Sequence, residues 1–321
     1  MRKVPALIAT AGLVLVTLTA CSPATDATDC DAPVSSGAAS DLVSVTGDFG
    51  SVPQVDFPTP LKTDSTQRSQ IIEGDGPGLV LGQKVQVDLS VFNGTTGESI
   101  EKSSYDGETT ANFVLNEATI AGLTDGLLCA QVGSRIAVVA SPEDAFGPAG
   151  GNADIGVAED DSIVFVLDVV KSYLTQADGA AQLPEAGLPA VVLAEDGTPG
   201  VIVPSADPPT DLEVGVLKKG DGDVVEDGAI VTVHYTGVIW DSKTVFDSSW
   251  AKGSPAAFVA ADGTTTEGGV IPGFANALIG QTVGSQIVAV IPPDQGYGDQ
   301  ASDTIPAGST LVFVVDILGV D

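Results

Sequence analysis

Three polar side chains in the last third of the chain are candidates for chemistry that needs neither a metal nor an acid–base pair. They are Tyr235, Asp247 and Tyr297. The same part of the chain contains apolar residues that are candidates for the wall of a pocket: Phe246, Phe258, Val270, Ile271, Phe274, Ile305 and Phe313. A water-excluding pocket with a few hydrogen-bonding groups at its edge favours a twisted amide, because that state is less dipolar than the planar one.

The reaction that suits such a pocket is rotation about an X–Pro peptide bond. The uncatalysed barrier is about 18–20 kcal/mol, because twisting destroys amide resonance. Millisecond turnover requires a barrier lower by roughly 5–6 kcal/mol, which a non-covalent site can supply. Tyr297 is the candidate donor to a substrate carbonyl, while Asp247 and Tyr235 are candidates for the polar edge of the pocket.

Each of these residues also has a plainer interpretation. Phenylalanines of a small domain are more often simple core residues. Asp247 precedes two serines and could cap a turn, and both tyrosines could be structural. Only the joint pattern favours a pocket. His234 alternates with Tyr235 on a predicted strand, so the two side chains face opposite sides of the sheet, and we interpret His234 as structural.

The elements that must position these residues belong to a unit that occurs twice. Gly74-Asp-Gly76 recurs as Gly220-Asp-Gly222. Residues 132–147 match 283–298, and residues 164–169 match 312–317. The offset between the copies changes little along the chain, which indicates loop insertions within one shared fold.

The second copy is predicted to be mostly strands with one short helix. Residues 229–239, 285–291 and 310–318 are rich in β-branched types. Residues 272–279 begin with Pro272 and precede Gly280, the residue types that favour the start and the end of a helix. The predicted fold class is therefore α+β, with two domains that each pack a curved antiparallel sheet around one short α-helix.

A succession of motifs in residues 211–321 resembles the FKBP family of peptidyl-prolyl cis/trans isomerases. The motifs are Val233-His-Tyr-Thr-Gly237, Phe246-Asp-Ser-Ser249, Val270-Ile-Pro-Gly-Phe274, Pro293-Asp-Gln-Gly-Tyr-Gly298, Ile305-Pro306 and Leu311-Val-Phe-Val-Val-Asp316. The resemblance implies that the ten candidate residues named above line a proline-binding pocket. It also implies that the protein needs no cofactor, that its partners are proline-containing segments, and that macrolide inhibitors are possible ligands.

The sequence departs from the family at two points of the pocket. Phe274 stands where the family commonly has Trp, and Ala256 replaces a frequent aromatic residue. The first copy departs further, with Leu89 in place of Tyr235, Glu101 near the position of Asp247, Leu123 near Phe274 and Phe146 at Tyr297, although Phe113 and Phe165 persist. We expect the first domain to keep the fold and to be weak or inactive as an isomerase.

Composition excludes some classes of function. The chain has 12 basic and 43 acidic residues and a formal charge of −31, so no basic surface is available for nucleic acid. One histidine and three cysteines leave little material for a metal site, and we expect none.

The N-terminus predicts export. Arg2 and Lys3 precede an apolar stretch, which indicates a signal peptide over residues 1–20. Leu18-Thr-Ala-Cys21 resembles the lipobox of bacterial lipoproteins, which implies lipidation of Cys21 and anchoring to a membrane. Ordinary secretion, with Cys21 as a bystander, is the alternative.

The remaining organisation follows from composition. Residues 21–40 are predicted to be a disordered tether, residues 41–173 the degenerate first domain, residues 174–189 a linker and residues 190–321 the second domain. Cys30 and Cys129 either form a disulfide in an oxidising compartment or remain two free thiols.

Three hypotheses of function compete at this point. The first is a membrane-anchored isomerase that assists the folding of exported proteins. The second is a non-catalytic chaperone or module that binds proline-containing segments at the cell surface. The third is a purely structural lipoprotein. The presence of Tyr235, Asp247 and Tyr297 favours the isomerase.

Overall fold

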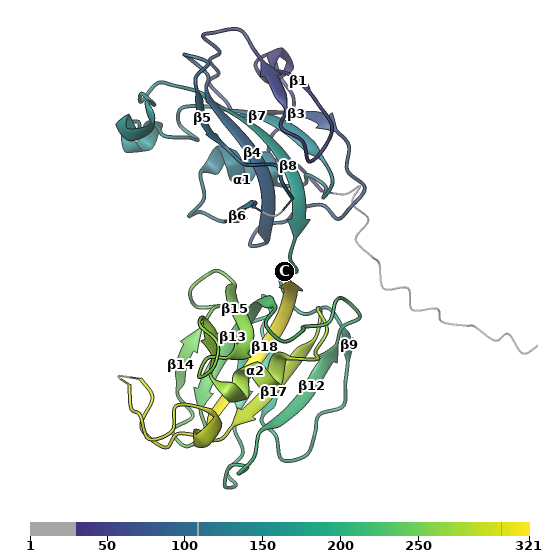
Figure 1. Cartoon of the computed structure of the whole chain (residues 1–321), viewed down its shortest axis with the longest axis vertical. Helices are drawn as coiled ribbons and strands as arrows, with labels where there is room; N and C mark the ends of the chain where they lie inside the picture. The colour runs from purple at the N-terminus through teal and green to yellow at the C-terminus, as the bar shows by residue number, and fades with distance from the viewer. Residues whose placement is uncertain (1–29, 108, 303) are drawn as a thin grey trace, which may run out of the picture.

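The computed structural model describes residues 30–107, 109–302 and 304–321. In these residues it contains two α-helices and four β-sheets, whose strand pairs are antiparallel except for one parallel pair. The predicted α+β class is confirmed at this level. Two bodies are joined where the chain leaves the first and where its C-terminal end returns (Figure 1).

The first body is built on a six-stranded sheet with the order β3-β7-β8-β4-β5, in which β6 also pairs with β4. One helix packs against β7. The bounds are β3 Gln67–Ile72, β4 Lys84–Asn93, β5 Ser99–Lys102, β6 Ala111–Val114, α1 Ala121–Leu127, β7 Arg135–Ala140 and β8 Ile163–Ser172.

The second body repeats this arrangement in an eight-stranded sheet with the order β16-β15-β13-β18-β17-β12-β9, in which β14 also pairs with β13. Its helix packs against β15 and β17. The bounds are β9 Ala180–Ala181, β12 Glu213–Lys219, β13 Ile230–Ile239, β14 Val245–Ser248, β15 Ala256–Asp262, β16 Gly269–Val270, α2 Pro272–Leu278, β17 Gln286–Ile291 and β18 Leu311–Val320.

The registers of the two sheets correspond residue by residue. Asp88 lies opposite Asp168 across β4 and β8, as His234 lies opposite Asp316 across β13 and β18. The helix prediction for the second copy is also confirmed: α2 has Pro272 in its first turn, and Gly280, just beyond its end, has φ +82°. Only glycine adopts such a φ without strain.

Each sheet buries both of its faces. One face carries the helix and the main hydrophobic core. The other face is covered by a two-stranded hairpin that precedes the sheet in the sequence: β1 (Ser44–Thr46) with β2 (Gln54–Asp56), and β10 (Ala190–Leu193) with β11 (Pro199–Ile202). The segments predicted as tether and linker take part in this layer, because Ala39, Ser40, Ala177 and Leu188 are buried.

A buried carboxylate at the same position of each repeat binds the segment that precedes the sheet. Asp168 accepts hydrogen bonds from Arg135 and from the backbone N–H of Gly50, while Arg135 also donates to the carbonyls of residues 47, 48 and 51. In the second body, Asp316 accepts from Gln286 and from the backbone N–H of Ala177. Burial raises the pKa of Asp316.

The two bodies meet where β8 ends beside the end of β18 (Figure 1). The Tyr173 hydroxyl lies 2.6 Å from both carboxylate oxygens of Asp321, which also forms an ion pair with Lys171. The backbone N–H of Leu174 donates to Leu318 O. Lys84 donates to Thr232 across the same junction.

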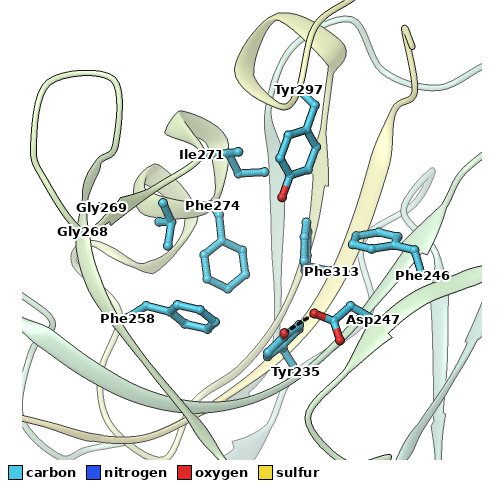
Figure 2. A pocket seen from close by; sticks show the side chains of 11 residues that line it. Tyr235, Phe246, Asp247, Phe258, Gly268, Gly269, Ile271, Phe274, Tyr297 and Phe313 are labelled. Carbon is cyan, nitrogen blue, oxygen red and sulfur yellow. Dashed lines mark hydrogen bonds between the residues drawn. The ribbon is translucent and has the colours of Figure 1, made fainter. Parts of the chain in front are cut away.

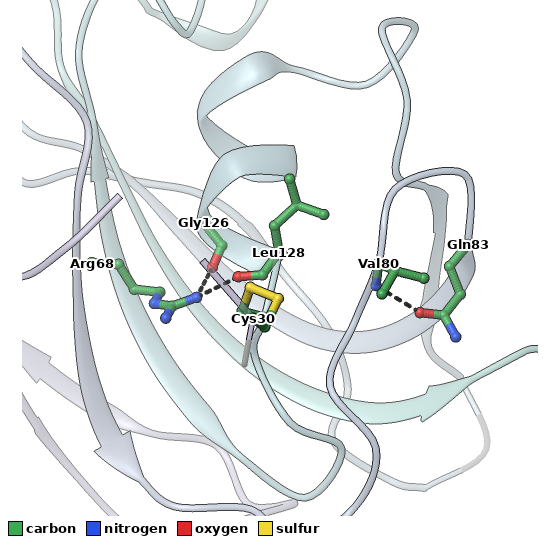
Figure 3. The surroundings of a disulfide bond; sticks show 7 residues. Cys30, Arg68, Val80, Gln83, Gly126 and Leu128 are labelled. Atoms are coloured by element: carbon green, nitrogen blue, oxygen red, sulfur yellow. Dashed lines mark hydrogen bonds between the residues drawn. A yellow bond between two sulfur atoms is a disulfide. The ribbon is translucent and has the colours of Figure 1, made fainter. Parts of the chain in front are cut away.

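Cys30 and Cys129 are disulfide-bonded, with their Cα atoms 5.6 Å apart. Figure 3 shows Arg68 beside this bond, donating to the carbonyls of Gly126 and Leu128 at the end of α1. The predicted signal peptide and Cys21 lie outside the described residues. Within the described ranges, no helix is long and apolar enough to span a membrane.

The ion pair of Arg135 and Asp168, whose side chains are both fully buried, generates a stability prediction. Replacing Arg135 by Met should destabilise the first domain by about 3–5 kcal/mol, because it leaves a buried carboxylate without its cation. Urea unfolding followed by far-UV circular dichroism measures this change. Trp240 and Trp250, the only tryptophans of the chain, both lie in the second domain. Their fluorescence is the internal control, and its midpoint should not move.

A paired substitution checks the reason for this loss. Arg135→Met combined with Asp168→Leu should be more stable than Arg135→Met alone, because no uncompensated charge remains in the core. A double variant no more stable than the single one would contradict this explanation.

Candidate active site

A cavity of about 410 Å³ opens on the helix-bearing face of the second sheet. Strands β13 to β16, β18 and helix α2 each contribute side chains to it, as does the segment after the 3-10 turn Pro293–Gln295. Its lining consists of Tyr235, Phe246, Asp247, Phe258, Gly268, Gly269, Val270, Ile271, Phe274, Tyr297 and Phe313 (Figure 2).

Strand pairing sets the spacing of one wall. Gly237 on β13 has Asp247 as its register partner on β14 and Phe313 as its partner on β18. A Cβ atom on Gly237 would lie 2.5 Å from the ring of Phe246. Glycine is therefore required at this position, because the Phe246 ring lies over it and meets Phe313 edge to face at 5.5 Å between centroids.

The floor of the cavity is formed by Phe274 in α2. Its ring centroid is 4.9 Å from that of Phe313 and 5.6 Å from that of Phe258, in edge-to-face contacts. Tyr235 also packs against both Phe258 and Phe274. These contacts hold the rings around one hollow, and Figure 2 shows them facing it.

The polar edge of the cavity is a hydrogen-bonded group around Asp247. The Tyr235 hydroxyl donates to Asp247 Oδ2 at 2.6 Å, and Lys252 Nζ lies 2.6 Å from Oδ1. The backbone N–H of Ser248 donates to Oδ1 as well. Burial opposes ionisation of Asp247, but the hydrogen bonds from Lys252 and Tyr235 hold its pKa below the usual range.

Tyr235 is held in the protonated form. Burial raises its pKa well above the usual value, and the neighbouring Asp247 carboxylate raises it further. At neutral pH the edge thus consists of a carboxylate, a neutral phenol and an ammonium group. These groups hydrogen-bond one another, which leaves the apolar interior of the cavity without an unpaired charge.

Tyr297 closes the cavity from the side opposite Asp247. Tyr297 is 47% exposed, and Figure 2 shows its hydroxyl directed into the hollow. A phenol in this place can donate a hydrogen bond to a ligand carbonyl, and the rings below supply an apolar surface for a pyrrolidine ring. No group of three or more metal-ligating side chains occurs in the part of the chain that the structure describes.

Nine of the ten residues predicted to form the pocket line this cavity. Ile305 is the residue that does not line it, although it belongs to the same hydrophobic core cluster as Tyr235 and Phe313. The sequence reasoning missed Gly268 and Gly269, which line the cavity, and Lys252, which pairs with Asp247. Adjacent glycines, and a lysine in so acidic a chain, are features that the sequence shows. Neither feature has a fixed spacing from the other pocket residues, so neither one indicated a pocket.

The first domain has the same strands with different side chains. Leu89 and Leu123, at the positions of Tyr235 and Phe274, are buried in its core. Glu101 has the register position of Asp247, since it pairs with Val91 as Asp247 pairs with Gly237, but its side chain is exposed. The hydroxyl and carboxylate arrangement of the second domain is therefore not repeated at these positions.

Comparisons with known proteins agree with this geometry. A sequence profile described as "FKBP-type peptidyl-prolyl cis-trans isomerase" matches residues 77–170 and 222–318, one match in each body. An FK506-binding protein of Streptomyces anulatus is 36% identical over 124 residues, which are 38% of this chain and 96% of that protein.

One further relative and one solved structure are also similar to this chain. The FKBP-type 22 kDa peptidyl-prolyl cis-trans isomerase of Escherichia coli is 43% identical over 108 residues, 33% of this chain and 48% of its own length. This chain thus spans about half of that protein. The crystal structure of the three FKBP domains of wheat FKBP73 matches 80% of this chain and 95% of its own, with 21% identity and a TM-score of 0.36.

The profile matches cover more than half of the chain, and both fall on bodies with the same strand order. The chain therefore belongs to the FKBP-type peptidyl-prolyl cis-trans isomerase family.

Proposed function

We propose that the second domain binds prolyl segments of exported proteins in its apolar cavity and accelerates cis/trans exchange there. One observation carries the proposal: Tyr235, Asp247 and Tyr297 converge with four phenylalanine rings on a single cavity of about 410 Å³. The arrangement provides an apolar site for the proline ring and a hydrogen-bonding edge for the peptide bond before it.

The proposed mechanism relies on moving the amide out of water. The planar amide is more dipolar than the twisted one, so it loses more solvation free energy when the Phe258, Phe274 and Phe313 rings surround it. Tyr297 holds a substrate carbonyl by a hydrogen bond. The Asp247 carboxylate, held by Tyr235 and Lys252, provides a fixed field at the edge where the amide rotates.

The first domain has a different proposed role. Its equivalents of Tyr235 and Phe274 are aliphatic core residues, so it lacks the groups on which this mechanism depends. We propose that it is weak or inactive as an isomerase and serves to hold substrate or to space the second domain.

The proposed place of action is the outer side of the cytoplasmic membrane, with a lipid on Cys21. The lipobox-like Leu18-Thr-Ala-Cys21 supports this proposal. The Cys30–Cys129 disulfide supports export, since such bonds persist in oxidising compartments. We also propose macrolide inhibitors as ligands of the cavity, whose floor is smaller because Phe274 stands where the family commonly has Trp.

Asp247→Val in the full chain should lower kcat/KM for an Ala-X-Pro-Phe peptide at least about tenfold, equal to ~1.4 kcal/mol of transition-state stabilisation. The substitution removes the charge that Tyr235 and Lys252 hold at the edge. A protease-coupled isomerase assay measures this loss of kcat/KM. Adding Tyr297→Phe should abolish the remaining turnover.

Glu101→Val is the matched control, because Glu101 has the same register position in the first domain and is exposed. It should leave kcat/KM unchanged. Peptide binding by the wild-type chain without any rate enhancement would contradict the enzymatic proposal and favour a binding module.

Cys21→Ser should release the protein from the membrane fraction, because the side chain that would carry the lipid is lost. Fractionation of cells and the mass of the mature N-terminal peptide measure this outcome. A wild-type N-terminal peptide without added lipid mass would refute the anchor.

A further inference from the structure

The edge of the cavity is also held from the opposite face of the sheet. Strand β14 is followed by a turn, residues 249–254, which carries Lys252. Ser249 in this turn binds both backbone groups of Tyr235: its Oγ accepts from Tyr235 N at 2.8 Å, and its N–H donates to Tyr235 O at 3.0 Å. The residue whose hydroxyl binds Asp247 is thus fixed through its backbone by the turn that follows Asp247.

His234 lies behind this contact, on the outer face of β13. Its Nδ1 is 2.9 Å from Ser249 Oγ, and both side chains are buried. Burial lowers the pKa of His234 to about 4, so the ring is neutral near neutral pH. A neutral Nδ1 can accept a hydrogen bond from the Ser249 hydroxyl. Ser249 Oγ at the same time accepts a hydrogen bond from the backbone N–H of Tyr235.

Trp250 completes the cluster by stacking on His234. The two ring centroids are 4.0 Å apart and the planes differ by 21°. The Trp250 indole N–H is buried and finds no acceptor among the described residues, so stacking and packing rather than a hydrogen bond fix this ring.

Other elements confine the cluster. A Cβ atom on Gly197, in the turn between β10 and β11, would lie 3.0 Å from the Trp250 ring. Leu81 and Gly82 of the first domain line the small cavity beside His234 and Trp250. Asp196 lines the same cavity as His234, and Asp316 is the register partner of His234 on β18.

The turn closes on this cluster and returns Lys252 to the pocket side. Gly253 N donates to Trp250 O at 3.1 Å, and Ser254 N donates to Ser249 O at 3.3 Å. Lys252 lies within the turn that these two hydrogen bonds close, and its ammonium group contacts Asp247 Oδ1. The position of the ammonium group thus depends on where Ser249 and Trp250 are held.

We propose that His234, Ser249 and Trp250 are positioning residues for the isomerase site, holding Asp247 and Lys252 in place from the outer face of the sheet. They do not line the cavity. The proposal rests on the proposed function for its kinetic consequence and goes beyond it by assigning a role to residues that touch no substrate.

The first domain shows which part of the cluster belongs to the fold in general. Ser103 makes the same two contacts with Leu89 as Ser249 makes with Tyr235. However, Asp88 replaces His234 in the register, and Ser104 rather than a tryptophan follows Ser103. The serine contact is thus shared by both domains, whereas the stacked His–Trp layer is specific to the domain with the cavity.

Two variants of the full chain test the proposal. Ser249→Ala removes the acceptor for Tyr235 N, and Trp250→Leu removes the stack while every side-chain hydrogen bond of Ser249 remains available. Each should lower kcat/KM for the proline peptide roughly five- to tenfold, mainly through kcat, because the rings that bind proline are untouched. Each should also raise the pKa of the Asp247 carboxyl, which NMR measures. The reference for this shift is the Asp247 pKa in Lys252→Met, a variant that lacks the ammonium group.

Ser103→Ala is the matched control, since it makes the equivalent change in the first domain, and it should alter neither readout. If Ser249→Ala does not fold, Trp250→Leu carries the test alone. Variants that lose stability but keep kcat/KM and the Asp247 pKa within error would overturn the proposal. An inactive wild-type chain would instead contradict the proposed function, and the Asp247 pKa would still decide whether the cluster positions the edge.

Discussion

The antiparallel pairing of β13 with β14 and β18 is the constraint on which the site depends. This pairing places Tyr235, Gly237, Asp247 and Phe313 within one small area of the sheet. The alternation of β13 directs Tyr235 to the cavity and His234 to the outer layer. A shift of one residue in this register would reverse both faces, which would turn His234 toward the helix-bearing core and Tyr235 toward the outer layer.

The two domains show how one framework supports different chemistry. Strand order, register, a buried carboxylate on the last long strand and an outer hairpin are common to both. The difference lies in side chains that have little effect on the framework. Leu89 fills space in the first core where Tyr235 gives the second a hydroxyl. Glu101 faces solvent, whereas Asp247 is held by the side chains of Tyr235 and Lys252.

Much of this fold follows from the sequence because its signals are local or repeated. The helix of the second domain has proline and glycine at its ends, and the strands are rich in β-branched residues, so their positions could be predicted within a few residues. The outer hairpins could not be predicted in this way. Their short strands have weak patterns, and they are stabilised by packing on a sheet that lies far away in the sequence.

The site was predictable to a similar extent. Side chains on paired strands, such as Tyr235 and Phe313, are brought together by register, which the alternation of the strands indicates. Ile305 lies in a loop, and its direction depends on how that loop packs, so its burial in the core was not visible. The Lys252–Asp247 pair also arises from a turn conformation, and His234 gains its partners only once that turn is folded.

The most direct test of this account is an NMR titration of the full chain with an Ala-Leu-Pro-Phe peptide. We expect the aromatic resonances of Tyr235, Phe274 and Phe313 to shift with a common saturation curve, together with exchange between the cis and trans peptide signals. The resonances of Leu89, Leu123 and Phe165 should not change. Shifts confined to the first domain, or scattered over both domains without a common saturation curve, would contradict the claim that one apolar cavity of the second domain binds and turns the prolyl bond.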